Sequence, residues 1–336
     1  TTNRSTIEVE VWRRATQLGD IGGAAVLTVL QLVVLAALVT WSARAQRRHA
    51  RTINLEGPIT RRRPVGRQRW WVAISVGAAL AVVTLPLLAL VERSLRADGS
   101  YSLAAWRSLG NDEIRPGLRL GIDPLGALRN SATTALWATT LAVVIGGLAV
   151  VAITALGRSG KLLDTGLMLP LGTSAVTIGF GMLITFDVDP VDWRASWWLV
   201  PVGHALVAVP FVVRSALGVS RSIDPDLRAA AATLGAPPIR AWASTTLPFL
   251  RQPLATGAGL AAAISLGEFG ATSFLSRSGS DTLPIAIERL LGRTGRLFQA
   301  QAFALSAILA AATMLIVMLV DTGAATERSN DRARHS

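Results

Sequence analysis

Residues 131–156 read SATTALWATTLAVVIGGLAVVAITAL, a stretch without a single charged residue. A helix rises about 1.5 Å per residue, so about 20 residues cross a hydrocarbon core that is about 30 Å thick. The stretch is therefore long enough and apolar enough to span a membrane. Because buried helices of soluble proteins rarely reach this length, the bilayer is the solvent that it indicates.

Six further runs share this character. They are Ile21 to Trp41, Val72 to Val91, Thr165 to Phe186, Ala195 to Val213, Pro253 to Leu275 and Ala302 to Val320. Backbone groups inside lipid must be hydrogen-bonded within their own segment, and the alternating ten-residue strands of a barrel are missing from the sequence. We therefore predict an all-α polytopic membrane protein with about seven transmembrane helices.

The composition of the 336 residues agrees with a membrane protein. Hydrophobic residues make up 51% and charged residues 16%, against roughly 25% charged in soluble domains. Cysteine is absent, which excludes disulfides and thiolate metal sites, and we propose no metal site of another kind. The net charge of +12 collects between the apolar runs, which favours a membrane surface over nucleic acid.

The basic residues also predict the topology. If residues 1 to 20 lie outside, the cytoplasmic segments 42–69, 157–164, 218–252 and 321–336 carry 18 Lys and Arg residues, against 14 on the other side. Tryptophans at the ends of the runs fit the headgroup layer. We therefore expect a multi-pass protein with a cytoplasmic C-terminus.

The two ends of the chain resemble each other. Residues 6–13 (TIEVEVWR) align with residues 282–289 (TLPIAIER), and each segment precedes an apolar run. If the repeat is real, residues 1–41 are the last helix of a preceding membrane unit and 42–69 are a basic cytoplasmic linker. Residues 70–320 then form a complete six-helix unit, followed by a tail over 321–336. Chance similarity between two such segments is the alternative.

A helix–turn–helix is predicted within the cytoplasmic segment 218–252. Asp224 can cap a helix, Pro225 fits its first turn, and Gly235 can take a left-handed conformation after the alanines. The small side chains would let another protein approach closely, and Asp226 and Arg228 supply polar edges.

This segment resembles the cytoplasmic motif of bacterial ABC importer permeases. The motif runs Glu-Ala-Ala, three residues, Gly, nine residues, then Ile-x-Leu-Pro, and here Ala229-Ala230-Ala231, Gly235 and Thr245-Thr246-Leu247-Pro248 keep that spacing without a gap. In this family the loop forms a coupling helix that sits in a cleft of the ATPase. The glutamate position is Ala229, so any salt bridge made by that glutamate is lost. An Ala-rich loop helix of an unrelated membrane protein is the alternative.

The resemblance implies a type I ABC importer permease in the bacterial inner (plasma) membrane. Such a chain moves its solute by alternating access and binds no cofactor, while ATP and Mg²⁺ belong to separate ATPase subunits. It also implies an extracytoplasmic solute-binding protein and a second permease half, fused or separate. The coupling residues it assigns are Asp226, Arg228, Ala229, Ala230, Ala231, Gly235, Leu247 and Pro248.

Residues 265–272 (SLGEFGAT) followed by Thr282-Leu283-Pro284 resemble the matching region of permeases for ferric iron and thiamine, which are often fused proteins of two halves. The resemblance thus favours iron or thiamine transport by a C-terminal half, and leaves phosphonate or other small polar ions open.

Few ionisable residues lie within the predicted spans. Glu268, with Thr272 nearby, is a candidate for the translocation path, because an ionisable group in a span must pair or face water. The alternative is that Glu268 is hydrogen-bonded and orders neighbouring helices. His204 is expected to be a bonded packing residue.

Two other classes of function compete with the permease. An ion-coupled secondary transporter would need more charge within the membrane than Glu268 and Arg214 provide. A membrane-embedded enzyme would need a catalytic set, but the sequence lacks His-Glu-x-x-His, Gly-x-Ser-x-Gly and a phosphate loop. We therefore expect a chain that catalyses no reaction.

Overall fold

The computed structural model describes residues 6–49, 64–97, 100–110, 113–115, 118–119, 122–157, 159–188, 191–193, 196–277 and 279–334. Helices make up nearly all of this part of the chain, so the predicted all-α polytopic fold is confirmed. Two hairpins of very short strands occur in the loops, β1 (Glu113–Arg115) with β2 (Leu118–Arg119) and β3 (Asp187–Val188) with β4 (Val191–Asp192).

The helices follow one another with short connections. Their bounds are α1 Ile7–Thr16, α2 Ile21–His49, α3 Arg67–Ser94, α4 Ala104–Arg107, η1 Ser108–Gly110, α5 Pro124–Ala155, α6 Gly160–Leu167, α7 Leu169–Gly172, α8 Ala175–Thr185, α9 Leu199–Ser222, α10 Pro225–Thr233, α11 Pro238–Thr245, α12 Leu247–Gly267, α13 Thr272–Leu275, α14 Leu283–Leu291 and α15 Arg296–Arg334.

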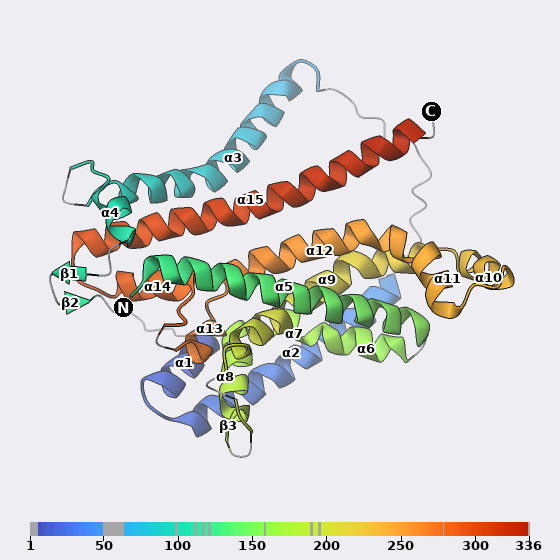
Figure 1. The fold of residues 1–336 in the computed structure, drawn as a ribbon, viewed down its shortest axis with the longest axis horizontal. Helices are drawn as coiled ribbons and strands as arrows, with labels where there is room; N and C mark the ends of the chain where they lie inside the picture. Colours follow the sequence, from blue (N-terminus) through green and yellow to red (C-terminus); the bar gives the residue numbers. More distant parts are fainter. Residues whose placement is uncertain are drawn as a thin grey trace.

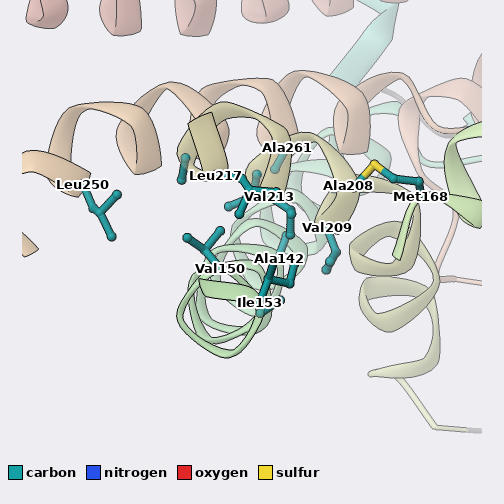
Figure 2. Close-up of a cluster of buried hydrophobic side chains, with 13 residues drawn as sticks. Ala142, Val150, Ile153, Met168, Ala208, Val209, Val213, Leu217, Leu250 and Ala261 are labelled. Carbon is teal, nitrogen blue, oxygen red and sulfur yellow. The ribbon is translucent and has the colours of Figure 1, made fainter. Parts of the chain in front are cut away.

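Three helices, α5, α9 and α12, form the centre of the bundle (Figure 1). Their facing sides bury small and β-branched residues, and Figure 2 shows Ala142, Val150, Val209 and Val213 meeting in this cluster. Small residues let the helices approach closely, which is how helices pack where lipid supplies no hydrophobic driving force. A side chain at Gly146 would lie 2.9 Å from Val212 Cβ. Small residues on the facing sides of α5, α9 and α12 therefore allow these three helices to pack closely.

A second layer is formed by the long helices α3 and α15; the C-terminal part of α3 lies beside the first part of α15, and the two helices then diverge (Figure 1). Nearly all of α3 is exposed and apolar, as expected of a lipid-facing helix. The amphipathic helix α14 packs between α15 and the start of α5, where Leu283, Ala286 and Leu290 are buried.

The N-terminal pair α1 and α2 packs against the opposite side. Val11 of α1 and Ala24 of α2 are fully buried in a cluster with Phe180 of α8 and Phe274 of α13. The Thr177 hydroxyl of α8 also donates a 3.4 Å hydrogen bond to the Gln31 side chain. This pair therefore has a specific docking surface on α8.

Five helices of the described residues are long and apolar enough to cross a membrane: α2, α3, α5, α9 and α15. The count rises to six if α6–α7 and α8 form one broken span, with a bend of 103° between them. The sequence predicted about seven, and the difference lies at 165–186 and 253–275. The first run breaks before Ser174, which caps α8, and in the second α12 ends at Gly267 before the separate α13.

The helix α12 reaches 21 residues, enough to cross the hydrocarbon core, but its first turns contain Arg251, Gln252 and Pro253. These residues lower the mean hydropathy of this short helix, so that it is not among the five apolar spans. Of the predicted basic linker over 42–69, residues 50–63 lie outside the described part of the chain, as do the side chains of most residues in the predicted tail 321–336.

Candidate coupling loop and translocation site

The predicted helix–turn–helix is present as α10 and α11, which project from one end of the bundle (Figure 1). The Asp224 side chain accepts a 3.0 Å hydrogen bond from the Asp226 amide, and Pro225 occupies the first turn of α10. Both features begin the helix as the sequence predicts, because a cap satisfies an orphan amide and proline has no amide to satisfy.

A glycine ends α10. Gly235 has φ +84°, and nothing lies within 4 Å of the position that its Cβ would take. The amide of Ala236 bonds the carbonyl of Ala231 at 3.1 Å, and the amide of Gly235 bonds that of Ala232 at 2.9 Å. Only glycine adopts this conformation without strain, so Gly235 sets the sharp turn into α11.

None of the residues of α10 is buried. Three large apolar residues are exposed here: Leu227 of α10 (45%), Leu234 directly after α10 (89%) and Ile239 of α11 (83%). An exposed apolar patch on a projecting helix pair is typical of a protein-binding surface. Ala230 and Ala231 lie on this exposed helix, so a partner can approach its backbone closely.

The loop is tied to the membrane helices at its base. Arg228 of α10 donates a 3.2 Å hydrogen bond to the hydroxyl of Thr246, which is 2% exposed and directly precedes α12. Leu247 and Pro248 then form the first turn of α12. This hydrogen bond links α10 directly to the residue that precedes α12.

The predicted path residues Glu268 and Thr272 lie together where α12 gives way to α13. Glu268 Oε1 accepts a 3.0 Å hydrogen bond from the Ala271 amide, and the Thr272 hydroxyl donates one of 3.0 Å to the Glu268 carbonyl. Glu268 is 8% exposed and Thr272 is fully buried. The geometry thus gives both residues a bonding role in the turn between the two helices.

His204 joins this turn to α9. Its Nε2 lies 2.7 Å from Thr272 Oγ1 and its Nδ1 lies 2.8 Å from Ser265 Oγ. Hydroxyl groups can both donate and accept, so Ser265 and Thr272 can pair with the two ring nitrogens in either tautomer of the imidazole. His204 is a bonded packing residue, as expected. Sequence reasoning missed Ser265, since nothing in its spacing pairs it with His204.

A cavity of about 1380 Å³ lies at the other end of the bundle, beneath the coupling loop. It is lined by residues of α2, α5, α6, α7, α9 and α10 and by Thr245 and Thr246. Ala229, at the family's glutamate position, lines it, whereas Glu268 and Thr272 do not. Its wall includes four basic residues, Lys161, Arg214, Arg221 and Arg228. Sequence analysis identified Arg214 only as a charged residue within a predicted membrane span and did not predict this cavity.

Comparison with known proteins shows the family. No family model matches the chain. The chain is 31% identical over 197 residues to the "putative 2-aminoethylphosphonate transport system permease protein PhnV" of Salmonella typhimurium, an alignment of 58% of this chain and 73% of the relative. It is also 29% identical over 251 residues to PhnU of the same system and organism, covering 69% of this chain and 83% of the relative.

The chain belongs to the ABC importer permeases. It is therefore a multi-pass inner-membrane transport permease and not an enzyme. The coupling motif and the apolar spans had predicted this family. The ferric iron and thiamine types, which residues 265–272 had favoured, find no support among these relatives.

Proposed function

We propose that this permease subunit carries a small phosphonate or similar anion inward in an ATP-driven importer. The observation behind this proposal is the projecting α10–α11 pair, whose Gly235 turn and exposed apolar residues suit a partner's cleft, combined with phosphonate permeases as relatives. We propose a phosphonate in place of the iron or thiamine suggested by the sequence, because the relatives are named as 2-aminoethylphosphonate permeases.

The proposed partners are ATPase subunits that bind ATP and Mg²⁺, and an extracytoplasmic binding protein that delivers the solute. The chain itself binds no cofactor in this scheme. Nucleotide-driven closure of the ATPase dimer would move α10, and the Arg228–Thr246 hydrogen bond would pass this motion to α12. Asp226, Ala230, Ala231 and Gly235 would face the ATPase, and Leu247-Pro248 would return the chain to the membrane.

We also propose that α1 and α2 are the end of a preceding permease half and that α3 to α15 are the second half. A similar arrangement at both ends of the chain supports this division. Each end has a short helix that follows a threonine cap, Thr6 or Thr282, and then a short link and a long apolar helix. The coupling loop and the C-terminus would then both be cytoplasmic.

A pulldown in mild detergent tests the function. The Gly235→Arg variant puts a bulky cation at the turn between α10 and α11, at a position whose positive φ is unfavourable for any residue with a side chain. Gly279→Arg is the matched control, because Gly279 has φ +86° and equally open surroundings. It lies at the far end of α5, where the Asn130 side chain of this helix donates to its carbonyl.

We expect an ATPase with a phosphate loop to co-purify with the wild type and with the Gly279→Arg control. It should be absent from the Gly235→Arg pulldown. Loss from both variants would indicate general misfolding, which thermal melting of the purified proteins detects. An ATPase that stays bound to a folded Gly235→Arg protein would show that this loop is not the docking element.

A further inference from the structure

The cavity beneath the coupling loop carries more positive than negative charge. Its two acidic residues are both engaged: Asp164 forms a 2.9 Å ion pair with Arg221, and Asp224 caps α10. The remaining basic residues, Lys161, Arg214 and Arg228, have no carboxylate within 4 Å in the described part of the chain. Their positive charge therefore remains available to a ligand.

Arg214 is the least expected of the three. It lies within the membrane helix α9, eight residues before the helix ends at Ser222, or about 12 Å along its axis. Its only hydrogen bond among the described residues runs from Nε to the sulfur of Met168, at 2.9 Å. A thioether is a weak acceptor and leaves the guanidinium charge uncompensated.

An unpaired arginine in a membrane span is expensive unless it faces water. Arg214 is exposed on the cavity side and lines the cavity together with Lys161, the only lysine in the chain. The guanidinium of Arg214 therefore keeps its positive charge and faces the open space of the cavity. Such a wall attracts small anions and raises their local concentration.

The cavity is also placed where a transported solute would leave. It is closed on one side by α9 and α6 and on another by α10, and Leu38 of α2 contributes to its wall. The wall of the cavity therefore includes both α2 and the coupling helix α10. At about 1380 Å³ it is larger than a typical small-molecule pocket, so a small anion would enter with part of its hydration water.

We propose that this cavity is an anion-binding station on the cytoplasmic side, in which Arg214 and Lys161 hold the phosphonate group of the solute before its release. The guanidinium of Arg214 offers two parallel N–H donors to a phosphonate, and Lys161 adds a mobile point charge. The identity of the anion as transported solute rests on the proposed function, whereas the anion site itself rests only on the cavity.

Binding is tested on the permease complex in nanodiscs of neutral phosphatidylcholine, without ATP or binding protein. Methylphosphonate is the probe, and broadening of its ³¹P resonance reports binding. Arg214→Gln removes the charge and Arg214→Lys retains it. Arg251→Gln is the matched control, because Arg251 is an exposed arginine near the start of α12 that does not line the cavity.

We expect Arg214→Gln to weaken methylphosphonate binding roughly tenfold or more, as for the loss of a charge-assisted hydrogen bond. Arg214→Lys should retain part of the affinity and Arg251→Gln all of it. Equal binding by all four proteins, or none by the wild type, would overturn the anion site.

Two further experiments distinguish a lipid-headgroup site from an anion site, and a failure of the anion site from a failure of the proposed function. Phosphatidylglycerol in the nanodiscs should leave methylphosphonate binding unchanged, and displacement of the probe by this lipid would show that the site holds a headgroup instead. The ATPase pulldown on the same proteins tests the proposed function separately. An intact ATPase complex without an Arg214-dependent site would refute the station and leave the importer standing.

Discussion

At the scale of single residues, the polar side chains of α9 include two groups, those hydrogen-bonded to neighbouring helices and those that line the cavity. His204 belongs to the first group, because both ring nitrogens have hydroxyl partners from α12 and α13. Arg214 belongs to the second. A polar group that is removed from water without a hydrogen-bond partner costs free energy, so His204 is expected to stabilise the fold and Arg214 is the proposed ligand-binding residue.

The His204 bridge predicts a measurable coupling of stabilities. His204→Leu should destabilise the protein by about 1–3 kcal/mol, because the buried hydroxyls of Ser265 and Thr272 lose a partner. Thr272→Val removes the other end of one bond. In thermal melts of the detergent-solubilised protein, the double variant should cost less than the sum of the single ones, and strict additivity would count against the bridge.

At the scale of elements, close contact between helices depends on glycines whose neighbours leave no room. Gly146 and Gly147 are adjacent in α5 and differ in this respect. A Cβ on Gly146 would lie 2.9 Å from Val212 Cβ of α9, whereas one on Gly147 would lie 3.8 Å from a Leu254 methyl group of α12. The pair therefore compares a tight contact with an ordinary one.

Gly146→Ala should lower stability by about 1–3 kcal/mol, since α5 and α9 must separate to admit the methyl group. Gly147→Ala should be neutral or stabilising, because alanine gains about 1 kcal/mol of helix propensity over glycine. Thermal melting of both variants in one detergent checks this difference. Equal losses would mean that α5 and α9 are not packed as described.

The coupling loop gives a second prediction at this scale. Thr246→Val removes the hydroxyl that accepts from Arg228 and keeps the side-chain shape. The ATPase should still bind, but we expect transport per ATP hydrolysed to fall by about half or more, because α10 and α12 lose a link. Thr256→Val is the control, since its hydroxyl donates within α12 to the Gln252 carbonyl and Thr256 does not line the cavity. Unchanged coupling in Thr246→Val would assign no role to this link.

Sequence reasoning predicted the elements whose signal is local. The cap at Asp224, the turn at Gly235 and the five long apolar helices follow from neighbouring residues alone. The break before Ser174 and the end of α12 at Gly267 were missed, because hydropathy continues through both while the chain turns. The cavity was also missed, since Lys161, Arg214 and Arg228 come together only in the folded chain.

At the scale of the whole molecule, the core of α5, α9 and α12 connects the two ends of the bundle. The coupling pair α10–α11 extends from one end of this core, and α14 with its bonded loop lies at the other (Figure 1). The Leu283 amide donates a 2.7 Å hydrogen bond to Ser131 there, which fixes α14 to α5. A packed core between the two ends suits the proposed permease, in which motion at α10–α11 would reach the opposite end of the bundle.

The most direct test of the central claim is uptake by the reconstituted permease with its ATPase and binding protein. Proteoliposomes loaded with ATP and Mg²⁺ should accumulate radiolabelled 2-aminoethylphosphonate only when the binding protein is present, and Gly235→Arg should abolish this uptake. Uptake that proceeds without ATP and follows an ion gradient would contradict the account, because the chain would then be a secondary transporter.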